Sequence, residues 1–338
     1  MGASPEVERR RVTLSDVARQ AGVSIATASF VLSGRDGQPA GSPATRSRVQ
    51  QAAADLGYRP NQHARAIRTG RTGAVALALG DTRDPWMGEL AHQVSVRAQT
   101  VGLSTVVLAD ESWFEFLQGH QFDCAFVTGA DFTRATREMV AELGRQGSRL
   151  VVFSELSPAD DFDVISSQMT PAVAKAYGQL RSRHDRVHFM ATDTVAVDPP
   201  MRTRQELFSD AAVATGDDPG DLVLRVPGTM SEARKEASAW LADPSRPTAI
   251  IAQTGYLAVA TQVAALHVGI RVPDDLEIIS IGDVPGPTSL ITPVSYYGAD
   301  DVFDRIARAV VHRAGADETE PFTRTELEWT FHPGGTTR

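Results

Sequence analysis

From residue 73 onward, the chain alternates short apolar runs with longer amphipathic stretches, and this alternation constrains its fold more than any other feature. The runs are rich in Val, Ile, Leu and Ala and fit buried strands, while nearly all the stretches between them have helical length. Strands that alternate with helices form parallel sheets with helices on both faces. We therefore predict a parallel α/β architecture with strands at 74–79, 104–108, 122–127, 150–153, 186–190, 222–226, 249–252 and 277–281.

Residues 13–58 show a different pattern, which predicts three short helices. Thr13 caps the first helix and Ser24 the second, and Gly22 fits a turn that needs a positive φ angle. Ser42 followed by Pro43 is a typical start for the third helix. The residues predicted to face inward are Leu14, Val17, Ala18, Ala21, Ala28, Val31, Leu32, Val49, Ala52, Ala53 and Leu56. A helix, a tight turn and a second helix are typical of a DNA-binding head.

The distribution of charge along the 338 residues supports a nucleic-acid partner. The formal net charge is −9, but residues 1–72 contain 11 Arg and 5 acidic residues and carry +6, so the remainder carries −15. A basic segment on an acidic body is typical of a DNA-binding head joined to a separate domain. A short arginine-rich arm that only increases solubility gives the same count, so charge alone leaves both interpretations open.

Residues 57–72 contain four arginines and no acidic residue, and they predict a short helix over about 61–69. An isolated helix of this length is marginal in water. We expect it to fold only against DNA or against its twin in a dimer.

Several other classes of protein lack their usual signals here. No apolar run approaches the roughly 18 residues of a membrane span, and the first residues are charged where a signal peptide is apolar, so we predict a cytoplasmic, nucleoid-associated protein without a membrane partner. The single cysteine, Cys124, lies in an apolar run and is predicted to be buried packing, with no disulfide and no metal cluster. No glycine-rich phosphate loop or hydrolase motif occurs. We predict no cofactor, no metal, no catalytic residue and no enzymatic activity.

A series of sequence matches in one register links the chain to a known family. The matches in the first 72 residues are TLSDVA (13–18), AGVS (21–24), AT (26–27), VL (31–32), SPATR (42–46), LGYRPN (56–61) and AR (64–65). They resemble the lactose-repressor (LacI/GalR) family of bacterial transcriptional regulators. Further matches to the same family are DPW (84–86), FD (122–123), PTAIIA (247–252), LAVA (257–260), VPDD (272–275) and ITPV (291–294).

The resemblance implies a fold, a function and a set of boundaries. The fold is an all-α helix-turn-helix head, a hinge helix and an α/β body of two lobes with parallel sheets, similar to a periplasmic binding protein. The function is that of a repressor that binds a near-palindromic DNA operator as a homodimer, with an affinity that a small molecule modulates. The expected parts are a disordered arm at 1–10, the head at 11–59, the hinge helix and linker at 60–72 and the body at 73–338. In the body, lobe one takes about 73–155 plus 296–318, and lobe two takes 156–295 plus 319–332.

The family's DNA-contacting positions carry over to this sequence residue by residue. The implied base-reading residues are Ile25, Ala26 and Phe30. The implied phosphate contacts are Ser24, Thr27, Ser29, Thr45, Tyr58 and Asn61. In the hinge, the implied minor-groove residues are Ala64 and Ile67, and Ile67 would act as an apolar wedge between base pairs. Two alternatives stay open: Phe30 turns into the core of the head, and Ile67 only packs between paired hinge helices.

The resemblance also implies an effector cleft between the lobes, with Trp86, Met87, Arg204, Thr254 and Asp283 as its candidate residues. This sequence departs from the family at three polar positions, where it has Thr254-Gly255 in place of an Asn-Asp pair and Gly282 in place of the first of two aspartates. Because polyol recognition needs several polar groups, an ordinary hexose is a poor candidate ligand. Trp86 and Met87 could stack on a flatter or more apolar molecule. The alternatives are that Trp86 packs at a helix start or a dimer interface, and that Arg204 makes a surface ion pair.

Three rival functions remain. The first is an orphan family member whose cleft binds no metabolite, the second is a solute-binding module, and the third is an α/β enzyme. The last two lack a secretion signal and a catalytic motif respectively. The sequence leaves open the operator, the effector, the sign of regulation and the choice between dimer and tetramer, although residues 331–338 show no heptad repeat and so favour a dimer.

Overall fold

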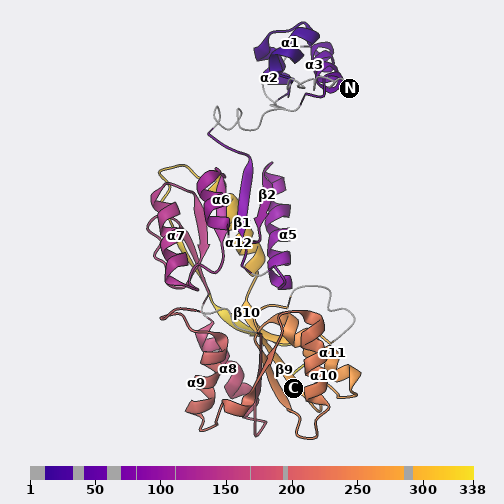
Figure 1. Cartoon of the computed structure of the whole chain (residues 1–338), viewed down its shortest axis with the longest axis vertical. Coiled ribbons are helices and arrows are strands. Elements are labelled where there is room, and N and C mark those ends of the chain that lie inside the picture. The colour runs from indigo at the N-terminus through magenta and orange to yellow at the C-terminus, as the bar shows by residue number, and fades with distance from the viewer. Residues whose placement is uncertain are drawn as a thin grey trace, which may run out of the picture. The chain divides into compact units, whose positions relative to one another are not determined.

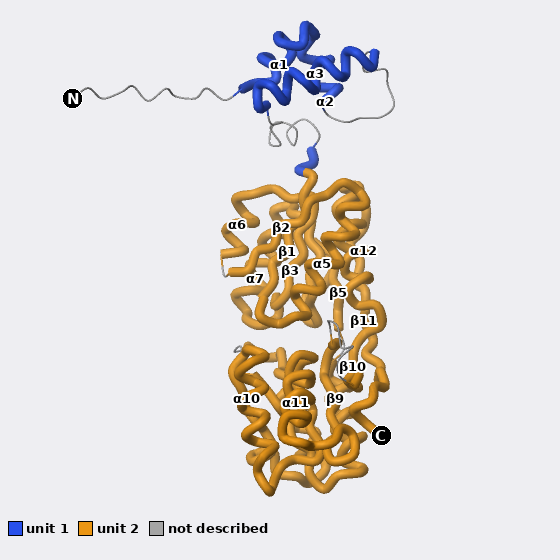
Figure 2. Tube along the Cα trace, turned by 90° about the vertical axis from the view of Figure 1, so that its right-hand side faces the viewer, with its two compact units in different colours: residues 1–72 blue, residues 73–338 orange. Residues whose placement is uncertain are grey.

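The computed structural model describes residues 12–32, 42–58, 70–80, 82–110, 112–167, 169–192, 197–284 and 292–338. The chain divides into two compact units, Met1–Thr72 and Gly73–Arg338 (Figure 2). The expected arm at 1–10, the loop at 33–41 and the hinge residues 60–69 lie outside the described residues.

The first unit contains three helices, α1 (Leu14–Ala21), α2 (Ile25–Leu32) and α3 (Pro43–Asp55). Thr13 and Asp16 form a capping box at the start of α1, and Gly22 ends this helix with a φ angle of 64°. At α3, the Ser42 side chain accepts a hydrogen bond from the Thr45 amide, with Pro43 in the first turn. The predicted caps are confirmed because short polar side chains satisfy amides that have no partner inside the helix.

One apolar cluster joins these helices. It consists of Val17, Ala18, Ala21, Ala28, Val49, Ala52 and Ala53, with Leu14, Val23, Val31, Leu32, Leu56 and Tyr58 packed against it. All the residues predicted to face inward belong to this set. The spacing of apolar residues along short helices is therefore sufficient to define the core of the head.

The second unit contains two sheets joined by three chain crossings (Figure 1). The first sheet has the strand order β11-β5-β4-β3-β1-β2, with every pairing parallel. Its strands are β1 (Ala74–Ala78), β2 (Ser104–Leu108), β3 (Cys124–Val127), β4 (Leu150–Phe153), β5 (Asp163–Ser167) and β11 (Arg324–Leu327). The helices of this lobe are α5 (Pro85–Thr100), α6 (Trp113–Gly119), α7 (Arg134–Arg145) and α12 (Val302–Gly315).

The second sheet has the order β12-β10-β9-β8-β6-β7, parallel throughout except for the pair of β10 and β12. Its strands are β6 (His188–Thr192), β7 (Val223–Val226), β8 (Ala249–Ala252), β9 (Glu277–Ile281), β10 (Ser295–Ala299) and β12 (Trp329–His332). The helices of this lobe are α8 (Thr170–Arg181), α9 (Arg204–Ala214), α10 (Met230–Leu241) and α11 (Gly255–His267), with a short 3-10 turn η1 (Gly220–Leu222). All eight predicted strands are present, within two residues at each end.

The lobe boundaries expected from the resemblance are wrong for three strands. Strands β5 and β11, expected in lobe two, pair with each other in the first sheet, and β10, expected in lobe one, lies in the second sheet. The chain therefore crosses between lobes after β5, after β10 and between β11 and β12, and not at the expected boundaries. The error arose because β5, β10, β11 and β12 carry polar residues and were not predicted as strands.

A buried ion pair explains how one of these polar strands enters the core. Asp163, the first residue of β5, is 5% exposed and accepts hydrogen bonds of 2.6 and 2.7 Å from the Arg313 guanidinium of α12. Thr323 adds its amide at 2.7 Å and its hydroxyl at 3.0 Å. A buried carboxylate is tolerated because its acceptor sites are filled in this way.

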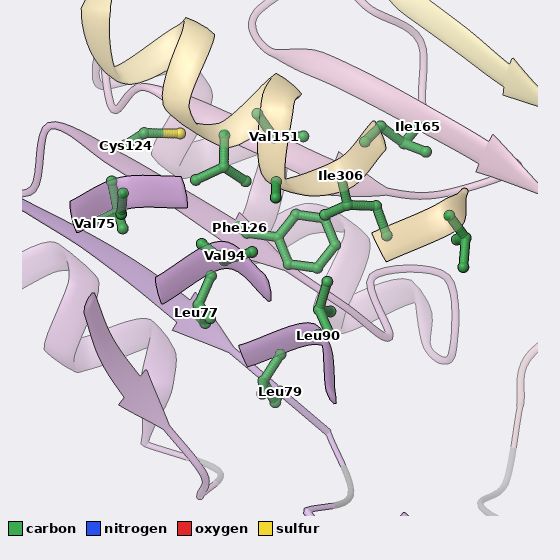
Figure 3. Close-up of a cluster of buried hydrophobic side chains, with 14 of the residues drawn as sticks. Val75, Leu77, Leu79, Leu90, Val94, Cys124, Phe126, Val151, Ile165 and Ile306 are labelled. Atoms are coloured by element: carbon green, nitrogen blue, oxygen red, sulfur yellow. The ribbon is translucent and has the colours of Figure 1, made fainter. Parts of the chain in front are cut away.

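Helices cover both faces of each sheet. In lobe one, α5 and α12 pack on one face of the sheet and α6 and α7 on the other. Alternate residues of β1 point to opposite sides, so this strand contributes to the apolar clusters on both faces. Figure 3 shows the first of these clusters, with Phe126 and Leu77 near its centre. Cys124 lies in the same cluster, fully buried and free, which confirms its predicted packing role. No helix in the described parts of the chain has the length and apolar character to cross a membrane.

Candidate functional sites

The second helix of the head begins with a cap that involves two predicted phosphate contacts. The Ser24 hydroxyl accepts a hydrogen bond from the Thr27 amide at 3.1 Å and lies 2.9 Å from the Thr27 hydroxyl. A helix start with exposed hydroxyls and unpaired amides favours a phosphate group. The cap therefore stabilises α2 and places both hydroxyls at its N-terminal end.

Two of the three predicted base-reading residues are exposed on α2. Ile25 is 53% exposed and Ala26 is exposed, whereas Ala28 is the one buried residue of the helix. Phe30 and Ser29 are half-buried, and among the described residues Phe30 does not belong to the core cluster of the head. The exposed part of α2 at its N-terminal end is therefore formed by Ile25 and Ala26.

The remaining predicted DNA contacts lie on and after α3, or outside the described residues. Thr45 is half-buried beside the Ser42 cap, with 3.2 Å between the two hydroxyl oxygens. Tyr58 packs its ring partly against the core of the head, and its amide donates to the Ala53 carbonyl at 2.8 Å. The predicted contacts that lie outside the described residues are Asn61, Ala64 and Ile67. Arg46 and Arg48 are exposed on α3, but the sequence analysis did not assign either as a contact.

The second candidate site lies where the two lobes of the body meet. Helices that follow parallel strands begin at the carboxyl edge of the sheet, where ligands of such folds usually bind. Trp86 lies in the first turn of α5 in lobe one, and its indole N–H donates to Asp283 of lobe two at 3.3 Å. Two of the predicted cleft residues are thus in direct contact across the lobes.

Trp86 also has the packing role that was its alternative interpretation. Its amide donates to the capping Asp84 carboxylate at 2.9 Å, and its ring lies 5.2 Å from Phe303 and 6.2 Å from Phe153, centroid to centroid. Met87 packs half-buried against the same core of lobe one. Of the predicted pair, only Trp86 has a hydrogen bond to lobe two.

Arg204, the first residue of α9, is half-buried and tethers this helix to neighbouring strands. Its Nη1 donates to the Gln253 carbonyl at 2.6 Å and to the Ile281 carbonyl at 2.9 Å, and its guanidinium lies 5.5 Å from the centre of the Trp329 ring. Burial lowers the pKa of Arg204, with Asp84 and Asp283 acting in the opposite direction. The alternative of a surface ion pair is wrong, because carbonyls and not carboxylates accept these bonds.

Glycines bring the backbone around Asp283 close to its neighbours. A Cβ at Gly255 would lie 2.3 Å from the Asp283 carbonyl oxygen, and one at Gly298 would lie 2.7 Å from its carboxylate. Gly282 has a φ angle of 103°, and a Cβ there would lie 3.4 Å from Arg204 Nη1. The positions where the family has polar side chains are therefore filled by main chain and by Arg204.

Burial affects the polar groups of two predicted cleft residues, Thr254 and Asp283. The Thr254 hydroxyl is buried and has no hydrogen-bond partner among the described residues. Burial raises the pKa of the Asp283 carboxyl, against the effect of the Trp86 hydrogen bond. Sequence reasoning missed Gln253 and Trp329. Gln253 contacts Arg204 through its backbone carbonyl, and Trp329 contacts it through its ring, and neither contact corresponds to a sequence motif. No group of three His, Cys, Asp or Glu side chains in the described ranges is arranged to hold a metal.

A helix-turn-helix head joined to a two-lobed α/β body defines a class of DNA-binding transcriptional regulators. Comparison with known proteins agrees in both parts. Residues 13–61 match the model for bacterial regulatory proteins of the lacI family, and residues 179–337 match a periplasmic binding protein-like domain. The chain belongs to the LacI family of bacterial regulatory proteins.

Relatives extend over most of the chain. The HTH-type transcriptional regulator DegA of Bacillus subtilis is 27% identical over 310 residues, which cover 86% of this chain and 89% of DegA. The HTH-type transcriptional repressor CytR of Escherichia coli is 24% identical over 282 residues, 80% of each chain. These relatives are transcriptional regulators, and this chain is a helix-turn-helix transcriptional regulator.

Solved structures show the same fold. A LacI-family transcriptional regulator from Silicibacter pomeroyi superposes with a TM-score of 0.76 at 22% identity, covering 97% of this chain and all of that one. The lac repressor dimer bound to operator and the anti-inducer ONPF superposes with a TM-score of 0.71 at 18% identity, covering 97% and 99%.

Proposed function

We propose that this regulator is a repressor that binds a near-palindromic operator as a homodimer and responds to a small molecule bound between the lobes of its body. The observation that carries the proposal is the outward face of α2, where exposed Ile25 and Ala26 follow directly on the Ser24 cap. Side chains at the N-terminal end of a recognition helix reach base edges in the major groove. Hydroxyls beside them bind phosphates and set the register.

The experiment that tests DNA binding is a gel-shift assay of the full chain against the DNA upstream of its own gene. We expect a specific complex that survives random competitor DNA and weakens steeply with salt, because phosphate binding releases counterions. Ile25→Ser should reduce the specific affinity about tenfold, since a good base contact is worth about 1–3 kcal/mol. Glu236→Ser, on the exposed surface of α10, serves as the matched control. Equal binding by both variants would refute the assigned recognition face.

Exposed apolar residues on one side of the body support the homodimer. On lobe one, Val96 is 49%, Val101 is 57% and Val107 is 45% exposed, and β2 is an edge strand of the first sheet. On lobe two, Leu266 of α11 is 71% exposed. Figure 2 shows α5, α10 and α11 on the side that faces the viewer. Apolar groups beside an open strand edge are typical of a surface that a second copy covers.

The C-terminal strand β12 is part of lobe two. Strand β12 pairs with β10, and Thr336 is fully buried, with its hydroxyl donating to the Ile278 carbonyl at 2.7 Å. These residues are therefore used within lobe two. We expect the wild-type protein to sediment at the mass of a dimer. Val101→Asp should dissociate into monomers, while Asp221→Ala, on the far side of lobe two, should stay dimeric. A tetramer would contradict the proposal.

A regulator whose cleft holds no metabolite remains the second candidate, and the contacts of Arg204 favour it. The guanidinium already donates to two carbonyls, and the glycines at 255 and 282 remove side chains that could bind hydroxyls. A thermal-shift screen decides between the two, because a ligand that binds only the folded state raises its melting temperature. A sugar acid, nucleoside or aromatic metabolite that stabilises the chain would exclude the orphan. We propose the cytoplasm as the place of action and assign no reaction to the chain.

A further inference from the structure

The first turn of α7, in lobe one, is capped by Thr133 of its own lobe, whose side chain accepts from the Thr136 amide, and in addition by a residue of lobe two. The amide of Arg134 has no acceptor inside its own helix and donates to the Asp198 carboxylate at 2.9 Å. In return, the Asp198 amide donates to the Phe132 carbonyl at 2.7 Å. Asp198 belongs to lobe two, six residues before α9 begins. The two lobes are thus joined here by a reciprocal pair of hydrogen bonds.

The lobe-one side of this contact is rigid. Asp131 is 5% exposed and accepts hydrogen bonds from the Ser154 hydroxyl at 2.6 Å and the Glu155 amide at 2.6 Å. The Phe132 amide donates to the Gly129 carbonyl at 3.1 Å, and the Arg137 guanidinium donates to the Asp131 carbonyl at 2.8 Å. A buried, fully bonded turn presents the Phe132 carbonyl and the start of α7 in fixed positions.

On the lobe-two side, the contact is linked to Arg204 by a short ordered segment. The Met201 amide donates to the Asp198 carbonyl at 3.1 Å, and Thr203 forms a capping box with Glu206 at the start of α9. The next residue, Arg204, is bonded to the carbonyls of Gln253 and Ile281. Residues 199–203 therefore connect Asp198 directly to Arg204.

We propose that Asp198 is an interlobe clasp, whose carboxylate closes the body by capping α7 of the opposite lobe and couples lobe closure to the position of Arg204. The Trp86–Asp283 hydrogen bond joins the lobes at a second point. A negative side chain at a helix N-terminus is favourable both as a cap and through the helix dipole. When the lobes separate, the Arg134 amide loses this partner. The clasp thus stabilises the closed arrangement of the lobes without any bound molecule. Chemical groups that displace Arg204 release the clasp.

The test measures the distance between the lobes by fluorescence energy transfer in the full chain. Arg145→Cys at the far end of α7 and Val213→Cys on α9 are exposed labelling sites, 57% and 63% respectively. The native Cys124 is fully buried, and burial raises the pKa of its thiol, so dyes attach only at the two new positions. Asp198→Ala should increase the open-to-closed ratio roughly three- to tenfold, in line with the loss of one charged cap.

Two further variants make the result specific. Asp198→Asn keeps an acceptor oxygen and should lie close to wild type, whereas Asp221→Ala removes an exposed carboxylate elsewhere on lobe two and should leave the distance unchanged. The clasp is refuted if Asp198→Ala and Asp221→Ala give the same distance distribution. It is also refuted if Asp198→Asn opens the lobes as far as the alanine variant. The measurement needs neither DNA nor effector, so its failure leaves the regulator assignment intact.

Discussion

Replacement of Arg313 by Met should strongly destabilise lobe one. Arg313 is 3% exposed and Asp163 is 5% exposed, and the two are joined by bonds of 2.6 and 2.7 Å. Asp163 holds the pKa of Arg313 above its ordinary value. Removal of the guanidinium leaves a buried carboxylate with only Thr323 as a donor. Such a loss costs about 3–5 kcal/mol, a large part of the roughly 5–15 kcal/mol that stabilises a typical domain.

The assay is urea unfolding of the full chain, followed by tryptophan fluorescence and circular dichroism. Arg308→Met is the matched control, because Arg308 pairs with Asp304 on the same helix while 57% exposed, and an exposed pair contributes at most about 1 kcal/mol. The double variant Asp163→Val with Arg313→Met should recover most of the loss, since it leaves no buried charge. If Arg313→Met unfolded within about 1 kcal/mol of wild type, the buried pair would not be what holds β5 in the first sheet.

Three further predictions concern the interlobe site and the core. Gly255→Ala should lower the melting temperature, because its Cβ would lie 2.3 Å from the Asp283 carbonyl oxygen. Gly269→Asn, at an open turn with a positive φ angle, should be tolerated. Equal melting temperatures for the two variants would contradict the close packing at Gly255. The pKa of Asp283 is raised in the folded protein, so the contribution of Asp283 to the free energy of unfolding should fall as the pH rises from the ordinary pKa of 3.8 through the folded value. Asp283→Asn should abolish that fall when unfolding is measured as a function of pH. Cys124 should resist thiol reagents until the chain unfolds, and fast labelling of the native protein would disprove its burial.

The sequence predicted the head more completely than the body, and the reason is physical. A short helix in a small head has only one face to bury, so apolar spacing identifies Val17, Ala28 and Val49 directly. Capping depends on residues three positions apart, so the caps Thr13 and Ser42 can also be predicted from the sequence. Local rules are sufficient because the partners are close in sequence.

The strands that were missed depend on partners far away in the chain. Strand β5 begins with Asp163, whose partner Arg313 lies 150 residues further along the chain. No residue near Asp163 in the sequence predicts this partner. The same limit applies to Arg204, whose acceptors are main-chain carbonyls 49 and 77 residues away. A backbone acceptor has no residue type, so a motif cannot predict it. The resemblance identified Arg204 and Asp283 as site residues, but only the structure shows what each of them contacts.

The opposite charges of the two parts of the chain have a consequence for specificity. Non-specific DNA binding is almost entirely electrostatic, and a body that carries −15 repels phosphates while a head that carries +6 attracts them. The head therefore has to supply both the charge and the base contacts. The helix that we propose for base recognition, α2, reads IATASFVL and contains no basic residue, so the proposal predicts base contacts made by apolar groups and hydroxyls. Operator discrimination then depends on close fit to thymine methyls and base edges and not on guanidinium forks. Such discrimination responds weakly to salt, whereas total affinity responds strongly, so the ratio of specific to non-specific binding should change little while both affinities fall with ionic strength.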